Sequence, residues 1–278
     1  MVNSEHKIPG GSGLKRVITG LIAIPLLLLL IIYGSVIWFL LLLLIINGLA
    51  LNELFGISVF SEEKRFKVLI TSLTSYLLLA VYLFGVNGLS GAFLTALFFL
   101  FLFILFDPNE LSTVIPRLGF GIFGIVYIGL LLSYLLMIRS LDQGVMIILF
   151  LLAMVWSNDT MAYYVGKGMG KKKLFPRVSP NKTVEGAAGG LTGGFLISIL
   201  FKIFLFDAIA YADLLILPLL VGVVSQLGDL FESIIKRGAG VKDTGALLPG
   251  HGGMLDRIDS LLFAAPFLYY YSLWRLAG

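Results

Sequence analysis

The chain has 278 residues, of which 59% are hydrophobic and 13% charged, and its mean hydropathy is +1.01. A soluble domain is about half apolar and about a quarter charged, so this composition argues against a water-soluble globule and predicts a membrane protein. The net charge of +4 indicates no acidic partner by itself, and the absence of cysteine excludes disulfides, thiolate metal ligands and cysteine nucleophiles.

Nine apolar stretches follow a polar, glycine-rich start, for which we expect a flexible leader or a cloning remnant over residues 1–13. A spanning helix needs about 20 mostly apolar residues. The stretches cover residues 14–33, 36–52, 67–85, 89–106, 118–138, 144–165, 186–206, 212–231 and 257–276. Only Gly34 and Ser35 separate the first two, so a tight hairpin and one kinked element are both open. The sequence predicts an all-α polytopic membrane protein with about nine transmembrane helices.

Basic residues are distributed unequally between the two sides that nine spans define. The N-terminus and the loops after even-numbered spans hold 17 of the 20 Lys and Arg residues, which leaves Arg139, Lys202 and Arg275 on the other side. Short cytoplasmic loops accumulate Lys and Arg. We therefore expect the N-terminus in the cytoplasm, the C-terminus outside and the functional loops on the cytoplasmic face.

The two halves of the chain differ in polarity. Residues 14–138, with the first five spans, are rich in Leu, Ile and Phe, which is typical of a transmembrane scaffold. Residues 139–278 place polar groups at membrane depth, where an ionised carboxylate costs several kcal/mol unless it faces water or an opposite charge. These groups are Ser157, Asn158, Asp159, Ser225, Gln226, Asp229 and Glu232. We expect spans six to nine, with cytoplasmic loops 166–185 and 233–257, to form the catalytic region.

The loop 166–185 carries groups suited to phosphate. Ser179 and Thr183 can hydrogen-bond phosphate oxygens and Lys182 can neutralise them, while Thr183 can also cap the following helix. A solvated loop that attracts anionic lipid is the alternative, and it fits the three lysines at 171–173 best. The sequence has no P-loop and no GxGxxG motif after a strand, so we expect no soluble nucleotide-binding domain.

The loop 233–257 is the densest constellation in the chain. Its six glycines let the backbone approach a ligand closely, and the cations of Lys236, Arg237 and Lys242 suit phosphate. A basic loop that only sets the topology is the alternative. His251 lies between glycines, so it is either a turn residue or a group that orients a phosphate or donates a proton.

Three carboxylates accompany these cations. Asp256 and Asp259 are three residues apart and share a helix face, and Asp229 can lie opposite them on the preceding span. Carboxylates beside cations, completed by substrate phosphates and water, form the oxygen-rich environment that Mg²⁺ prefers. An interfacial ion-pair cluster with Arg257 is the alternative.

The run S-x2-K-R-x4-K-D-x-G-x3-P-x-H-G-G-x2-D-R-x-D at residues 233–259 resembles the signature of the CDP-diacylglycerol synthases, or phosphatidate cytidylyltransferases. The segment Ser179-Pro-Asn-Lys-Thr-Val-Glu-Gly186 and the residues Asn158, Asp159, Ala162 and Tyr163 also resemble that family. The likeness is specific in the second half of the chain, whereas the first five spans match only as generic hydrophobic sequence.

The resemblance implies transfer of the cytidylyl group of CTP to phosphatidic acid, which forms CDP-diacylglycerol and pyrophosphate for phospholipid synthesis. The lipid phosphate would attack the α-phosphorus of CTP in line, with Mg²⁺ required and K⁺ as a second cation. It also implies a homodimer in the cytoplasmic (inner) membrane, with the active site facing the cytoplasm. We expect no nucleic-acid partner.

The resemblance assigns roles to individual positions. Catalytic roles fall to Asp229, Lys236, Arg237, Lys242, His251, Asp256, Arg257 and Asp259. Metal binding falls to Asp229, Asp256 and Asp259. Substrate-binding candidates are Asp159, Ser179, Lys182, Thr183, Ser233 and Asp243.

Three other classes of protein share some of these features. A secondary transporter would also place carboxylates at membrane depth, but it should show an internal repeat, which the sequence lacks. A CDP-alcohol phosphotransferase should carry D-x2-D-G-x2-A-R-x8-G-x3-D-x3-D, which is missing, while a polyprenyl-phosphate enzyme would share only Mg²⁺ and acidic residues. A purely structural membrane protein would need no such site.

Overall fold

The computed structural model describes residues 12–107, 110–207, 209–245 and 252–275, with side chains from residue 21 onward. The longer helices are α1 (Ser12–Tyr33), α2 (Val36–Gly56), α3 (Lys64–Phe84), α4 (Val86–Phe106), α7 (Gly144–Met169), α8 (Val184–Phe204), α9 (Asp213–Gly238) and α10 (Leu255–Arg275). One composite helix follows a 3₁₀ turn at Leu111–Thr113 and joins α5 (Val114–Gly124), a π-helical segment (Ile125–Leu130) and α6 (Leu131–Arg139). The strands β1 (Lys173–Phe175) and β2 (Ser179–Thr183) form an antiparallel hairpin.

Seven helical stretches within the described residues are long and apolar enough to cross a membrane. They are α2, α3, α4, the composite stretch Leu111–Arg139, α7, α8 and α9. The side chains described for α1 form a shorter apolar helix, Leu21–Tyr33. Helix α10 has 21 residues but carries Asp256, Arg257 and Asp259 at its start. The prediction of a polytopic helical membrane protein is confirmed, while the count of nine spans stays a prediction.

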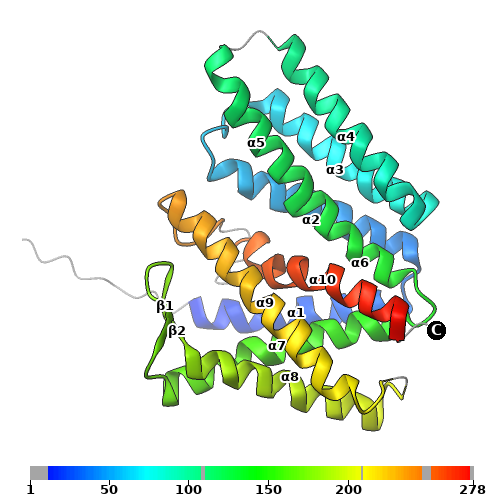
Figure 1. Ribbon diagram of the computed structural model, residues 1–278, viewed down its shortest axis with the longest axis vertical. Helices are drawn as coiled ribbons and strands as arrows, with labels where there is room; N and C mark the ends of the chain where they lie inside the picture. The colour runs from blue at the N-terminus through cyan, green and yellow to red at the C-terminus, as the bar shows by residue number, and fades with distance from the viewer. Residues whose placement is uncertain (1–11, 108–109, 208, 246–251, 276–278) are drawn as a thin grey trace, which may run out of the picture.

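The helices form two layers joined by α10 (Figure 1). Helices α2 to α6 pack together in one layer, and α7, α8 and α9 pack together in the other. Helix α10 lies between them and contacts α9 and α7 on one side and α6 and α2 on the other. The β1–β2 hairpin and the end of α9 lie at the same end of the molecule, opposite the end of α10 (Figure 1).

Polar side chains and close backbone contact hold α7, α8 and α9 together. The Gln226 amide donates to Asn158 Oδ1 at 2.9 Å and to the Ala187 carbonyl at 3.0 Å, so one side chain of α9 links both other helices. Helix α8 approaches α7 through glycines, and a Cβ atom at Gly190 would overlap with Asn158 Oδ1. Small residues allow such close packing in membranes, where it replaces a hydrophobic driving force.

The structure decides one alternative that the sequence left open, and it differs from the prediction in the loop 166–185 and at the end of α9. Gly34 and Ser35 interrupt the chain, so the first two predicted spans are separate helices. The predicted loop 166–185 contains the β1–β2 hairpin, and α9 continues through Gly238 instead of ending at residue 231. The last turns of α9 contain an i,i+4 ion pair between Glu232 and Lys236, which favours helical structure there. The predicted leader over residues 1–13 lies outside the described residues except for its last two, where α1 begins.

Candidate active site

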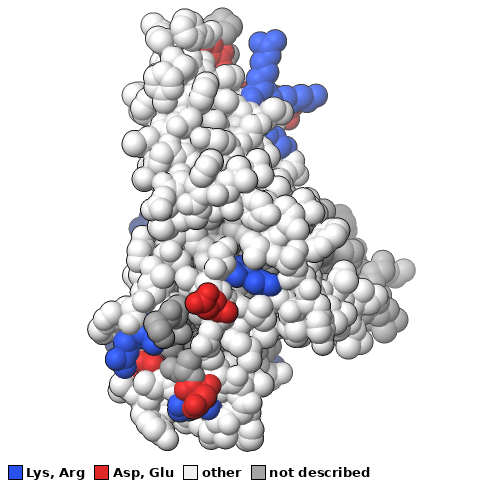
Figure 2. Space-filling view, turned by 90° about the vertical axis from the view of Figure 1, so that its right-hand side faces the viewer, with Lys and Arg blue, Asp and Glu red and all other residues white. Residues whose placement is uncertain are grey.

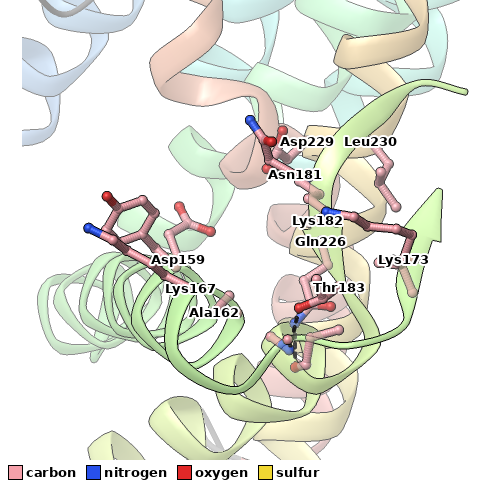
Figure 3. A pocket seen from close by; sticks show the side chains of 16 residues that line it. Asp159, Ala162, Lys167, Lys173, Asn181, Lys182, Thr183, Gln226, Asp229 and Leu230 are labelled. Atoms are coloured by element: carbon pink, nitrogen blue, oxygen red, sulfur yellow. Dashed lines mark hydrogen bonds and ion pairs between the residues drawn. The ribbon is translucent and has the colours of Figure 1, made fainter. Parts of the chain in front are cut away.

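A cavity of about 680 Å³ opens between the end of α7, the β1–β2 hairpin, the start of α8 and α9 (Figure 3). Its wall is shared by acidic, basic and neutral polar side chains. They include Asp159, Tyr163, Lys167, Lys173, Asn181, Lys182, Thr183, Gln226 and Asp229. Mixed charge around a concave space at the boundary of apolar helices is typical of a binding or catalytic site, so this cavity is the candidate active site.

Lys182 and Asp229 meet at this cavity from different elements. The Lys182 ammonium of β2 lies 2.5 Å from Asp229 Oδ2 of α9, and the two side chains are 27% and 36% exposed. The hairpin brings Lys182 there because β2 pairs with β1 through the contacts Lys173 to Thr183 and Phe175 to Ser179. An anionic ligand would therefore meet a cation already held by a carboxylate.

The predicted cap of α8 is confirmed. The Thr183 hydroxyl accepts a hydrogen bond from the Gly186 amide at 3.1 Å, which satisfies one free N–H of the first turn. Glu185 accepts from the amides of Lys171 and Lys172, at 3.0 Å and 3.2 Å to its Oε2 atom, and so ties the hairpin to α8. Thr183 has both a structural contact and a place in the cavity wall.

A second charged cluster lies at the junction of α9 and α10. The Lys236 ammonium contacts Glu232 Oε2 and Asp256 Oδ1, each at 2.6 Å, and the Glu232 side chain is 1% exposed. The other oxygen of Glu232, Oε1, is buried and has no hydrogen-bond partner among the described residues. Glu232 also interacts electrostatically with Asp259. Sequence reasoning placed Glu232 at membrane depth but not in this cluster.

Asp256 is fully engaged in hydrogen bonds. Its Oδ1 atom contacts Lys236, while its Oδ2 atom accepts from the Gly253 amide at 2.8 Å and the Thr244 amide at 3.2 Å. In the contact with Gly253, a side chain in the first turn of α10 reaches back to a backbone amide that lies just before the helix. Asp256 therefore holds Thr244 and Gly253, which both precede α10, in fixed positions.

Asp159, Asp229 and Asp259 interact electrostatically, and Arg257 also interacts with Asp159. Asp159 and Asp229 line the cavity, whereas Asp259 is buried next to it and is 7% exposed. The structure thus brings the predicted residues of α7, α9 and α10 to one place.

Other predicted residues lie apart from the cavity. Arg237 donates to the Val178 carbonyl at 3.3 Å and to the Val241 carbonyl at 2.9 Å, which connects the end of α9 to the hairpin turn. The other candidates outside the cavity wall are Ser179, Ser233, Lys236, Lys242, Asp243, Asp256 and Arg257. His251 lies outside the described residues.

A divalent cation fits these residues only with help from a substrate. Among the residues that the structure describes, no three Asp, Glu or His side chains form a group that could hold one ion. Mg²⁺ is usually bound by one or two carboxylates together with phosphates and waters. Asp229 and Asp259, which interact electrostatically, are two carboxylates of the kind that this smaller requirement needs.

Glu53 is a residue of this region that sequence reasoning missed. It belongs to α2, yet its carboxylate accepts from the amides of Met254 and Leu255, both at 2.8 Å. A signal was present, because Glu53 is the only acidic residue between residues 14 and 61. Glu53 was not selected as a candidate because the first half of the chain was expected to be a generic scaffold.

Comparisons with known proteins cover nearly the whole chain. The model of the cytidylyltransferase family matches residues 14–274. The chain is 39% identical over 266 residues to the phosphatidate cytidylyltransferase of Bacillus subtilis strain 168, covering 92% of this chain and 96% of that protein. It is 34% identical over 261 residues to the enzyme of that name from Thermotoga maritima, covering 91% and 94%. The resemblance inferred from the motifs is confirmed, and the chain belongs to the cytidylyltransferase family.

Proposed function

We propose that the protein is a phosphatidate cytidylyltransferase, a nucleotidyltransferase that transfers the cytidylyl group of CTP to phosphatidic acid and releases pyrophosphate. The observation that carries this proposal is the cavity in which Lys182 and Asp229 meet, built from the segments that resemble the family. Relatives that bear this enzyme name match the chain over more than nine tenths of its length.

The cavity suits two polyanionic substrates, one from water and one from the bilayer. Lys167, Lys173 and Lys182 lie in its wall and can neutralise phosphate oxygens. The helices around it expose apolar side chains such as Leu227 of α9, 52% exposed, along which a lipid substrate can lie. CTP enters from the cytoplasm, while phosphatidic acid keeps its acyl chains in the membrane.

The reaction needs positioning more than proton transfer. The phosphate of phosphatidic acid is already an anionic nucleophile, so the enzyme must chiefly align it with the CTP α-phosphorus against charge repulsion. Lys182 and Lys236 hold the phosphates, and preorganised cations stabilise the charge that develops on the leaving pyrophosphate. Bound Mg²⁺ would add Lewis-acid stabilisation of that charge. Asp229 and Asp259 would hold it, whereas Asp256 serves the loop because its oxygens already accept hydrogen bonds.

The proposal includes topology and assembly. Nine helices cross the cytoplasmic membrane, with the N-terminus and the hairpin end in the cytoplasm and the C-terminus outside. Support comes from the face opposite the hairpin, on which the described Lys, Arg, Asp and Glu residues form a few small groups (Figure 2). The family resemblance extends the proposal to a homodimer and to K⁺ as a second cation.

Product formation by detergent-purified protein tests the function. With phosphatidic acid, labelled CTP, Mg²⁺ and K⁺, we expect a labelled lipid and pyrophosphate, and no product when the lipid, CTP or Mg²⁺ is omitted. Lys182→Met should lower kcat/KM for CTP about 10- to 100-fold, the value of a charge-assisted hydrogen bond. The matched control is Lys172→Met, an exposed lysine of the same region that does not line the cavity. No labelled lipid from folded protein would refute the proposal.

A further inference from the structure

Glu53 connects the first half of the chain to the start of α10. Its side chain extends from α2, and the residue is 7% exposed. Oε1 accepts from the Met254 amide and Oε2 from the Leu255 amide, each at 2.8 Å. The Leu255 amide belongs to the first turn of α10 and the Met254 amide directly precedes it, so neither has a partner within the helix. With Asp256 accepting from Gly253, three successive N–H groups at this helix end are satisfied by carboxylates.

The surrounding backbone is shaped around this carboxylate. A Cβ atom at Gly253 would lie 2.5 Å from Glu53 Oε2, and one at Gly245 would lie 2.7 Å from Glu53 Oε1. Real Cβ atoms do not approach so closely, so both positions need glycine while Glu53 is in place. The glycines of the loop therefore have a physical role besides any approach to substrate.

Thr244 links Glu53 to the charged cluster. Its hydroxyl lies 3.3 Å from Glu53 Oε2 and 3.1 Å from Asp256 Oδ2, and its single proton can be donated to either oxygen. Asp256 in turn contacts Lys236 at 2.6 Å. A continuous series of polar contacts thus runs from α2 through the loop to α9.

The burial of Glu53 argues that this contact is specific. Within the described residues, Glu53 forms no ion pair with Lys or Arg, so the N–H groups of α10 and the Thr244 hydroxyl satisfy its buried oxygens. A carboxylate near a helix N-terminus is stabilised by the helix dipole, whereas a buried one without donors is strongly unfavourable. Packing alone would be served equally well by an apolar residue.

We propose that Glu53 is a positioning residue for nucleotide binding: it holds residues 244–245 and 252–255 so that Asp256 keeps Lys236 directed at substrate phosphate. The role of Glu53 in nucleotide binding rests on the proposed transferase activity. The hydrogen bonds that join Glu53 to the start of α10, which we call the clamp, do not depend on that activity. Glu53 touches no substrate in this scheme and acts through Thr244 and Asp256. The first half of the chain thereby contributes to the site.

Glu53→Gln tests the clamp with little change in shape. In glutamine, an NH₂ group replaces one of the two carboxylate oxygens, so one of the two backbone amides now faces a donor instead of an acceptor. That hydrogen bond is lost, and a buried N–H group is left without a partner. In substrate-free protein, hydrogen exchange followed by mass spectrometry should be about tenfold faster or more in peptides covering residues 252–259, the effect of an unsatisfied buried group. Glu62→Gln, at an exposed glutamate just beyond α2, should exchange like the unsubstituted protein.

Kinetics separate positioning from simple loss of folded protein. A smaller folded fraction lowers apparent kcat and leaves KM unchanged, whereas misplaced Lys236 should raise KM for CTP about tenfold. Unchanged exchange together with unchanged KM in Glu53→Gln would overturn the inference. If the unsubstituted protein forms no product, the proposed function fails while the exchange comparison still decides the clamp.

Substitutions of Thr244 keep the inference testable if Glu53→Gln does not fold. Thr244→Val removes the hydroxyl at similar volume and should speed exchange and raise KM in the same direction. Thr244→Ser retains the hydroxyl and should restore both values. Equal behaviour of the valine and serine variants would contradict the proposed link.

Discussion

The helices of the two layers pack against one another through different kinds of side chain. In α2 to α6 the buried residues are mostly apolar, and aromatic rings such as Phe55 and Phe66 pack edge to face. In α7 to α9, and between this layer and α10, hydrogen bonds and ion pairs cross between elements, as at Gln226 and Asn158. Apolar packing tolerates many arrangements of similar volume, whereas polar groups in a membrane must each find a partner. The second layer is therefore the more narrowly determined one, and it carries the cavity.

The largest expected effect on turnover comes from removing a buried carboxylate next to the cavity. Asp259→Asn should lower turnover about 10²- to 10³-fold, the cost of removing one electrostatic group from an active site, because the proposed Mg²⁺ loses a ligand. The protein should stay folded, since asparagine keeps the shape. Steady-state product formation and thermal unfolding in detergent measure the two quantities.

Asp142→Asn is the matched control for Asp259→Asn. It changes an exposed aspartate between α6 and α7 and should leave turnover unchanged. Normal turnover in Asp259→Asn, with Mg²⁺ dependence unaltered, would remove Asp259 from the proposed metal site.

An intermediate effect is expected where backbone contact positions the polar helices. Gly190→Ala places a Cβ atom on Asn158 Oδ1, so α8 must move away from α7 and the link to Gln226 weakens. We expect a loss of about 1–3 kcal/mol in the free energy of unfolding, typical of overpacking, with a few-fold loss of turnover. Thermal or denaturant unfolding in detergent measures it.

Gly91→Ala on α4 should change the free energy of unfolding in the opposite direction. A Cβ atom there meets nothing within 4 Å, so alanine should stabilise the helix by about 0.5–1 kcal/mol. Equal effects at the two glycines would mean that the close approach of α7 and α8 does not limit stability.

The smallest effect on catalysis is expected in the first layer. Arg117 of α5 is 3% exposed and forms ion pairs with Asp107 at 2.6 Å and Glu63 at 2.8 Å. Arg117→Met should cost about 2–3 kcal/mol in unfolding free energy, below the value for a fully buried pair because Glu63 is partly exposed. KM for CTP and turnover of the folded fraction should not change.

Arg65→Met, at an exposed position near the start of α3, should leave stability unchanged. A change of KM in Arg117→Met, at equal folded fraction, would show that the first layer influences the site by more routes than Glu53.

Much of the molecule was predictable because membrane helices are encoded locally. Apolar stretches located the helices to within a few residues, and the residue types and spacing of the run at 233–259 indicated the family. The predicted loop 233–257 begins later than expected, since α9 continues through Gly238 and its last turns contain the Glu232–Lys236 ion pair. The hairpin in loop 166–185 was also missed, since two strands of three and five residues leave little periodicity.

The sequence by itself determined the membrane class, the family and the residue types of the site, because hydropathy and motif spacing are properties of neighbouring residues. Only the tertiary structure decided which charges meet: Lys182 with Asp229, Lys236 with both Glu232 and Asp256, and Glu53 with an amide 202 positions away. Such pairings depend on how helices pack across the whole chain, and a buried carboxylate is satisfied by whichever donors that packing brings to it.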